Sequence, residues 1–298
     1  MEESRPGHHF IIQKDQPSDP DGLASLVVDY AEFLRRESEV IKQFPVPVEK
    51  ILDHYGVDIQ TRPIEGDRQG LKFSSAHLPY QVVFIEEEDK KTRRRFSVAH
   101  ELVELLFEAL HDGILSTRME EACSGDRKER LCEKGAAELL MPEAAYRSYL
   151  KEHPVSFETG SRLADLFQVS FLSALIRMVN LAPRPSLLIA WREKLKPSQQ
   201  KQKNPGQLTL PGMESAGPSE KLRVEWYRWT EESSHPYVPM NISVPTGSVI
   251  QRALEEGRRL SRTEHFSLGK PFSGKFNIGA MPLQIGEEKW VISLFDVS

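Results

Sequence analysis

The sequence predicts an α+β protein that has more than one domain. Segments with the helical spacing of apolar residues surround a cluster of short apolar runs that have the character of strands. A stretch over residues 196–219 is rich in Pro, Gln, Gly and Ser, loses the apolar period, and separates a second group of predicted strands from the first. The length of 298 residues also suggests two or three domains.

The N-terminal part begins with a segment that lacks a helix or strand pattern. Residues 1–22 are polar and rich in Pro and Asp, which predicts a disordered arm. Helices are predicted over residues 24–42 and 47–56, the second with Pro47 near its start and Gly56 at its end. Three short strands follow over residues 57–64, 70–78 and 80–88.

Helices dominate the middle of the chain. The apolar spacing predicts a long helix over residues 92–110 and another over 126–142, which Pro142 ends. Helical segments fill residues 143–182, and residues 186–192 have the pattern of a strand or a short helix. The part that follows the linker predicts a small α/β unit with one helix, residues 248–260, and four strands, residues 222–231, 238–245, 276–286 and 289–297.

Composition and charge exclude several classes of protein. The net charge of −5 and a pI near 6.0 give no general attraction to nucleic acid. Cys123 and Cys132 are too few for a disulfide framework and lack C-x-x-C spacing, so we expect a reducing, cytoplasmic location. No apolar run approaches the about 18 residues of a membrane span, so we expect no membrane association.

One predicted helix contains a motif that is close to a metal site. Residues 100–104 read His-Glu-Leu-Val-Glu, which is the zinc-peptidase motif H-E-x-x-H with glutamate in place of the second histidine. Because positions i and i+4 of a helix lie on one face, His100 and Glu104 can ligate one ion. Glu101 is displaced by about 100° around the helix, so it can serve as the general base that acts on a water.

A third ligand has to come from a second helix. Glu129 and Glu133 lie four positions apart in the predicted helix over residues 126–142. This spacing suits one carboxylate that ligates the metal and a second that supports a ligand by a hydrogen bond.

Together, the two segments resemble a known family. "RRRFSVAHELVELL" followed by "ERLCEKGAAELLMPE" resembles the ImmA/IrrE family of bacterial metallopeptidases, whose pattern is R-R-F-x-x-A-H-E-x-x-H and then E-x-x-A-[DN]-x-F-A-x-x-L-L-M-P. The resemblance covers roughly residues 25–182 and implies a zincin-like domain with a divalent metal, normally zinc. It implies that His100 is a ligand, Glu101 the general base and Glu129 the third ligand, while Glu133 stands at the supporting position.

Three positions depart from the family pattern. Glu104 replaces the second ligand histidine, Cys132 replaces a small residue, and Gly135 replaces an aromatic residue that packs the helix. A carboxylate can ligate zinc at about 2.0–2.2 Å. One histidine with two carboxylates nevertheless makes a more anionic site, in which Mn²⁺ or Fe²⁺ competes better with Zn²⁺.

A purely structural interpretation stays open for these helices. Cys132 can be a buried small hydrophobe or a replacement ligand. The charged residues of the first helix can be the solvated face of an ordinary amphipathic helix. Its apolar residues form a single stripe: Phe96, Ala99, Leu102, Val103, Leu106 and Leu110.

Residues 161–182 have the pattern of a helix-turn-helix, with Ser170 as the N-cap of the second helix. The charges between residues 155 and 182 sum to zero: Glu158, Arg162, Asp165 and Arg177. The second helix begins Phe-Leu-Ser-Ala, which offers few groups for base edges or phosphates. We therefore expect a structural helical extension and no direct DNA binding.

The predicted domains follow from these patterns. The arm over residues 1–22 precedes a zincin-like ImmA/IrrE domain over 23–152, a helix-turn-helix-like extension over 153–195, the linker over 196–219 and a small α/β domain over 220–298. The last segment resembles the final hairpin of a GAF-type sensor domain, and the best-known stress-response members of the family carry such a domain. A docking domain without a ligand is the open alternative.

The favoured function is a regulatory, metal-dependent peptidase that inactivates a repressor-type transcription factor by cutting it. The first alternative is a catalytically inactive member of the family that binds such a partner through the same cleft. The second is a DNA-binding transcriptional regulator. We expect a protein partner, with zinc as the metal and Mn²⁺ or Fe²⁺ as substitutes.

Overall fold

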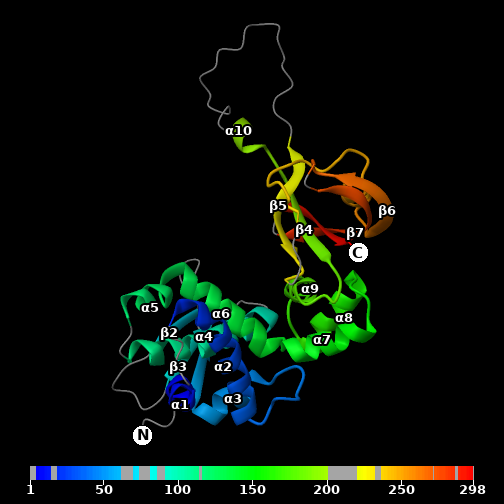
Figure 1. Ribbon diagram of the computed structural model, residues 1–298. Coiled ribbons are helices and arrows are strands. Elements are labelled where there is room, and N and C mark those ends of the chain that lie inside the picture. Colours follow the sequence, from blue (N-terminus) through cyan, green and yellow to red (C-terminus); the bar gives the residue numbers. More distant parts are fainter. Residues whose placement is uncertain are drawn as a thin grey trace. The chain divides into compact units, whose positions relative to one another are not determined.

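The computed structural model describes residues 5–14, 19–61, 70–73, 81–85, 91–113, 116–200, 220–231, 236–270, 272–285 and 288–297. The chain divides into two compact units. The first comprises Met1–Tyr146 and Ser161–Ala174, and the second comprises Arg147–Gly160 and Leu175–Ser298. The mixture of helices with two sheets confirms the predicted α+β class (Figure 1).

Helices pack around a small sheet in the first unit. The sheet has the order β1-β3-β2, in which β3 runs parallel to β1 and antiparallel to β2. The strands are β1 (Val57–Thr61), β2 (Gly70–Phe73) and β3 (Gln81–Ile85). The helices of this part are α1 (Pro6–Gln13), α2 (Leu23–Glu37), α3 (Val48–Tyr55), α4 (Lys91–His111), α5 (Thr117–Ala122) and α6 (Gly125–Leu140), with a 3-10 turn at Pro20–Gly22.

Part of the segment predicted as a disordered arm is helical. In α1, Phe10 is 4% exposed, and its ring centroid lies 5.2 Å from those of both Tyr30 and Phe33 on α2. A Cβ at Gly7 would lie 2.2 Å from the Leu105 carbonyl oxygen, so the glycine permits close approach to α4. A single aromatic residue and a glycine therefore attach a segment whose other residues are mostly polar.

The ends of two helices follow from local chemistry. Gly56 ends α3 in the left-handed conformation with φ 62°, a geometry that favours glycine. Ser170 precedes α9 (Phe171–Asn180) and its hydroxyl accepts a hydrogen bond from the Ser173 N–H at 3.1 Å. Both ends confirm the sequence prediction.

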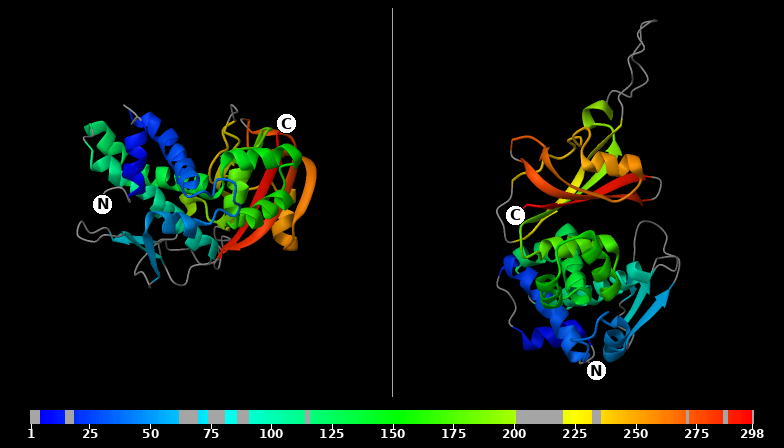
Figure 2. Two further views of the ribbon diagram at one scale, coloured as in Figure 1. Left: turned by 90° about the horizontal axis from the view of Figure 1, so that it is seen from below. Right: turned by 90° about the vertical axis from the view of Figure 1, so that its right-hand side faces the viewer.

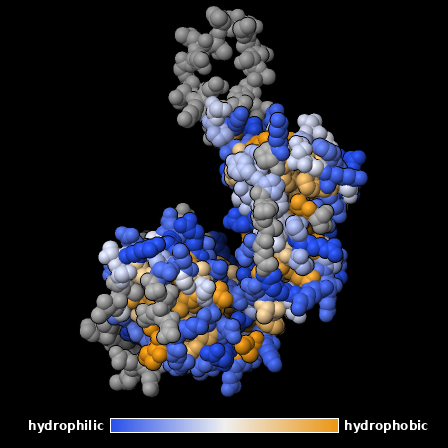
Figure 3. Space-filling model, viewed as in Figure 1, coloured by the Kyte–Doolittle hydropathy of each residue, from blue (hydrophilic) through white to orange (hydrophobic). Residues whose placement is uncertain are grey.

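The helices after α6 include the predicted helix-turn-helix. α7 (Glu143–Glu152) is followed by α8 (Phe157–Phe167), and α8 and α9 meet at 113°. This angle lies in the range of about 90–120° that helix-turn-helix pairs show. Within the described ranges no single helix meets the length and apolarity of a membrane span, although the bent α8–α9 pair does so when both are counted together. On the face of the molecule drawn in Figure 3, which is viewed as in Figure 1, most residues are hydrophilic.

The core of the second unit is a five-stranded antiparallel sheet with the order β5-β4-β8-β7-β6. α11 (Val249–Glu256) covers one face (Figure 2) and contributes Val249, Ile250 and Ala253 to a core that includes Trp191. The strands are β4 (Ser186–Lys194), β5 (Lys221–Trp229), β6 (Leu260–Ser267), β7 (Ser273–Ile285) and β8 (Glu288–Asp296).

The observed sheet differs from the sequence prediction in three features. β4 precedes the predicted linker, yet it lies between β5 and β8, so the C-terminal sheet begins before residue 196. The strand predicted over residues 238–245 is reduced to one bridge between Arg223 and Ser243, and β6 was not predicted. Within the linker, α10 (Pro197–Gln200) is described, whereas residues 201–219 lie outside the described part.

Candidate functional site

α4 and α6 pack side by side, and α2 packs against α6 (Figure 1). α4 carries His100, Glu101 and Glu104, while α6 carries Glu129 and Glu133. Two helices that are distant in the sequence therefore bring the predicted site residues into one unit.

The structure brings two of the predicted ligands together. His100 Nε2 on α4 lies 3.4 Å from Glu129 Oε2 on α6. The His100 side chain is 18% exposed and the Glu129 side chain is 57% exposed, so the pair lies where the two helices open to solvent. A nitrogen and a carboxylate oxygen are donors that zinc accepts.

Glu104 has a different partner. Its Oε1 forms a hydrogen-bonded ion pair with Lys128 Nζ on α6, and the Lys128 and Glu104 side chains are 21% and 24% exposed. In the part of the chain that the structure describes, no three His, Cys, Asp or Glu side chains are grouped so that they could hold a metal ion. The predicted set His100, Glu104 and Glu129 is thus only partly assembled.

The other two predicted site residues differ in burial. Glu101 is 6% exposed on α4, so its carboxylate is withdrawn from bulk solvent, as the role of a general base beside a cleft requires. Glu133 is exposed on α6, one turn after Glu129. Their predicted roles as base and support stay predictions.

Charges around Lys128 hold it in the ammonium form. Burial lowers the pKa of Lys128, but the hydrogen bond and negative charge of Glu104, with contributions from Cys132 and Glu129, raise it above its ordinary value overall. A positive charge therefore lies between α4 and α6 at neutral pH.

Cys132 faces the same group of charges. Burial raises the pKa of the Cys132 thiol, and the nearby carboxylates of Glu104, Glu129 and Glu101 raise it further, while Lys128 opposes them. Metal ligation needs the thiolate. The protonated, buried thiol is consistent with the use of Cys132 as a small hydrophobe, and the structure records it as a free cysteine.

Gly135 explains one departure from the family pattern. A Cβ at this position would lie 2.7 Å and 2.9 Å from the two methyl carbons of Val103 on α4. The glycine lets α6 approach α4 closely at the point where the family has an aromatic residue. The close approach lies between the His100–Glu129 pair and the end of α6.

The basic residues in the first turns of α4, Lys91 to Arg95, include one with a structural role. Arg95 is buried and donates a hydrogen bond from Nη2 to the Val46 carbonyl at 2.9 Å.

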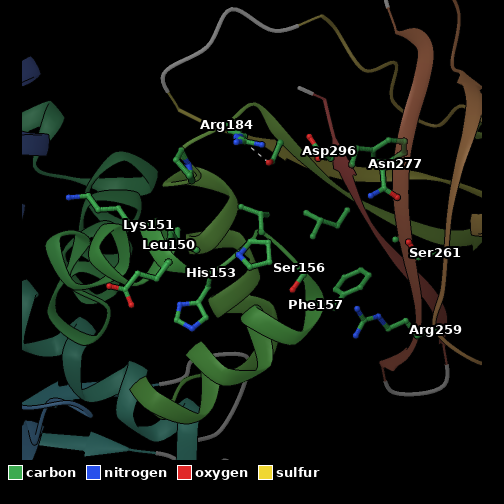
Figure 4. Close-up of a pocket in the computed structure, with 18 residues that line it drawn as sticks. Leu150, Lys151, His153, Ser156, Phe157, Arg184, Arg259, Ser261, Asn277 and Asp296 are labelled. Carbon is green, nitrogen blue, oxygen red and sulfur yellow. Dashed lines mark hydrogen bonds between the residues drawn. The ribbon is translucent and has the colours of Figure 1, made fainter.

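A groove of about 740 Å³ lies in the second unit, remote in sequence from the metal motif (Figure 4). Phe157 packs on the sheet because Gly279 has no side chain: a Cβ there would lie 3.2 Å from the ring. Arg259 lies over the same ring at 5.3 Å, and Arg184 and Asp296 also line the groove. None of the predicted site residues lines it.

Lys128 is the site residue that the sequence analysis missed. A signal was present, because a lysine directly precedes the candidate ligand Glu129 and an acid replaces the second ligand histidine. Compensating charges on two candidate ligand helices indicate an ion pair. The contact itself depends on how α4 and α6 are aligned, which helical spacing within each segment does not determine.

The types of donor atom at the site are ones that a divalent metal accepts, although the described side chains are not grouped to hold one. An imidazole and carboxylate oxygens form a set that Zn²⁺, Mn²⁺ and Fe²⁺ accept. His100 and Glu129 already lie together, while Glu104 is engaged by Lys128. Ligation by all three would require Glu104 to leave Lys128.

Comparisons with known proteins bear on the same segment. Residues 52–179 match the peptidase M78 family model, described as the IrrE N-terminal-like domain. The radiation response metalloprotease IrrE of Deinococcus radiodurans is 31% identical over 134 residues, which are 44% of this chain and 39% of that protein. Its counterpart from Deinococcus deserti is 32% identical over 133 residues, 43% of this chain and 44% of that protein.

The matched segment spans less than half the length of either curated relative. A solved structure titled Mycobacterium tuberculosis transcriptional regulator covers 91% of this chain and 76% of its own, with a TM-score of 0.51 and 13% identity, which shows a likeness of fold alone. The family implies a divalent metal, typically zinc. Residues 52–179, with the two helix motifs in their expected order, thus form an IrrE N-terminal-like domain of the ImmA/IrrE family.

Proposed function

We propose that this chain is a regulatory peptidase of the zincin type that inactivates a repressor-type transcription factor by cutting it. The observation that carries the proposal is the 3.4 Å contact between His100 Nε2 and Glu129 Oε2 across α4 and α6. It joins, in space, the two motifs that define the family, and the curated relatives are named metalloproteases.

Each site residue has a role in this proposal. His100, Glu104 and Glu129 would hold the divalent metal, zinc by family likeness, with Mn²⁺ or Fe²⁺ as substitutes. When bound, the metal supplies Lewis acidity that activates water and polarises the scissile carbonyl. A carboxylate oxygen of Glu101 takes the proton of the attacking water and passes it to the leaving amine. Glu133 would orient a ligand by a hydrogen bond.

The partner is a protein and not DNA. The chain carries a net charge of −5, and the α8–α9 segment is neutral in sum. Ala174 at the front of α9 is buried, and Phe171, Leu172 and Ser173 are half-buried, so these positions offer little to base edges. A peptide partner would contact the solvent-exposed part of the α4–α6 pair beside Glu129 and needs no net positive surface.

Incubation with purified repressor-type proteins tests the proposal. We expect the wild type to cleave one such protein at a defined bond, and Glu101→Gln to bind the same protein without cleaving it. Glu120→Gln removes an exposed acid on α5 as the matched control and should cleave like the wild type. Cleavage by Glu101→Gln at the wild-type rate would contradict the assigned role of Glu101.

The second candidate function is binding of the same partner without cleavage. The ion pair between Glu104 and Lys128 favours it, because one of the three expected ligands is engaged elsewhere. In this case the wild type and Glu101→Gln both bind the partner and leave it intact. A zinc-loaded wild type that cuts the partner excludes this candidate.

The second unit has a proposed supporting role. For the second unit we propose a GAF-like domain, with a docking domain that binds no ligand as the alternative, and the groove beside Phe157 is the candidate ligand position of the first interpretation. The two cysteines, both free and buried, support a cytoplasmic setting.

A further inference from the structure

We infer that Lys128 is an internal cation of the α4–α6 site, which competes with a divalent metal for Glu104 and so lowers the affinity of the site for that metal. The inference rests on the proposed function only in taking this site as the metal-binding one. It adds a residue that the ImmA/IrrE motif does not include.

The contact is direct and shielded. Lys128 Nζ donates a hydrogen bond to Glu104 Oε1, and about four fifths of each side chain is withdrawn from solvent, with exposed fractions of 21% and 24%. Solvent therefore screens this pair less than an ordinary surface ion pair. Glu104 occupies the position where the family pattern has a ligand histidine, so the ammonium engages a candidate ligand atom.

The surrounding charges explain why a cation belongs there. Glu104 is in contact with Lys128, Glu129 follows Lys128 on α6, and Glu101 follows His100, which lies 3.4 Å from Glu129, so three carboxylates belong to this region of α4 and α6. Three carboxylates in such a region repel one another. The Lys128 ammonium offsets part of this repulsion in the absence of a metal.

A metal and the ammonium cannot use Glu104 equally well at the same time. A metal ligated by Glu104 lies about 2.0–2.2 Å from its oxygen, which places like charges next to each other if Lys128 stays in contact. The lysine side chain has a flexible four-carbon stem, so the ammonium can move to solvent when the metal arrives. The result is competition and not exclusion.

The test is a chelator-competition titration of the full chain with zinc alone. Lys128→Gln removes the charge and keeps a polar side chain, Lys128→Arg keeps the charge, and Lys134→Gln removes an exposed lysine from the same helix. Loss of a partly shielded ion pair changes a binding equilibrium by a few-fold, so Lys128→Gln should bind zinc roughly fivefold more tightly than the wild type. Lys128→Arg and Lys134→Gln should bind zinc like the wild type.

Equal zinc affinity in Lys128→Gln and the wild type overturns the inference. A gain in zinc affinity in Lys134→Gln equal to that in Lys128→Gln also overturns it, because it would show that net charge alone raises the affinity. If Lys128→Gln does not fold, the wild type with ¹³C-labelled lysine gives a second measurement. The Lys128 Cε resonance should shift as zinc binds, and a resonance that stays unchanged at zinc saturation overturns the inference. Wild-type protein that retains stoichiometric zinc against a strong chelator also overturns the inference.

These outcomes are separate from those of the proposed function. The titration contains no protein partner, so its failure leaves cleavage of a repressor-type protein untouched. Absence of any cleaved or bound partner would remove the proposed function while the zinc measurements still decide the role of Lys128.

Discussion

Two ion pairs on α6 join it to different neighbours and show two different uses of the same interaction. Near the end of α6, Glu138 Oε1 lies 3.6 Å from Arg35 Nη2 on α2, and the two side chains are 7% and 6% exposed. Near its start, Lys128 pairs with Glu104 on α4 at a more open position. Glu138 also accepts hydrogen bonds from the Glu143 N–H at 3.1 Å and 3.3 Å.

The two ends of α6 also differ in how closely their surroundings follow the family pattern. Glu138 lies in the segment "AAELLMP", which follows the family pattern, and its buried pair ties α2, α6 and the start of α7 together. The departures Glu104, Cys132 and Gly135 lie where α6 faces α4. Glu138 itself stands at an unspecified position of that pattern, so α6 follows the surrounding motif there and departs from it where it faces α4.

The largest effect should come from breaking the buried pair. Glu138→Ala leaves Arg35 buried without its carboxylate and should lower the free energy of unfolding by about 3–5 kcal/mol. Lys128→Ala, the comparison at the other end of α6, should cost about 1 kcal/mol or less. Urea unfolding followed by circular dichroism measures both, and equal costs would remove the distinction between the two pairs.

A smaller loss of stability should follow from a side chain at Gly135. Alanine gains about 1 kcal/mol of helix propensity over glycine, but its Cβ meets Val103 in a filled space, where overpacking costs about 1–3 kcal/mol. We expect Gly135→Ala to be destabilising overall and Val103→Ala in the same chain to recover part of the loss. Additive costs in this double-mutant cycle would show that the two residues do not press on each other.

The role of position 104 can be tested by restoring the histidine of the family pattern there. Glu104→His should raise zinc affinity without unfolding the protein, because imidazole is a common zinc ligand and Lys128 loses its partner. A chelator-competition titration measures the gain, with Glu108→His, also on α4, as the matched control. Zinc binding that is equal to or weaker than that of the wild type would contradict the assignment of position 104.

The smallest effect is expected when the protein is added to duplex DNA. Random duplex DNA at about 50 and 200 mM salt should give no polarisation change in either condition, because phosphate-driven binding needs several lysine or arginine contacts. Arg177→Ala should therefore change nothing. Micromolar binding that falls steeply with salt and is lost in Arg177→Ala would move the functional surface from α4–α6 to α8–α9.

The sequence predicted the features that local chemistry determines. Gly56 and Ser170 marked helix ends, and the spacing of His100 and Glu129 within their helices predicted a shared site that the structure partly assembles. The place of β4 was harder to predict, because β4 precedes the linker while both of its neighbours, β5 and β8, follow it. Pairing across distant segments leaves little trace in a local apolar pattern.

Two further features needed the folded chain. Phe10 is one aromatic residue in a largely polar segment, and its contacts with Tyr30 and Phe33, with the close approach of Gly7 to α4, show that α1 belongs to the core. The Glu104–Lys128 pair depends on the alignment of α4 with α6. Glu104 faces α6, where it contacts Lys128, and the sequence did not identify that cation.

The most direct measurement of the central claim is a crystal structure of the full chain grown with excess zinc, with anomalous diffraction recorded at the zinc edge. The account predicts one ion between α4 and α6, bound by His100, Glu104 and Glu129, with Lys128 turned away from Glu104. No anomalous peak between these helices, or an ion bound there while Lys128 still pairs with Glu104, would contradict it.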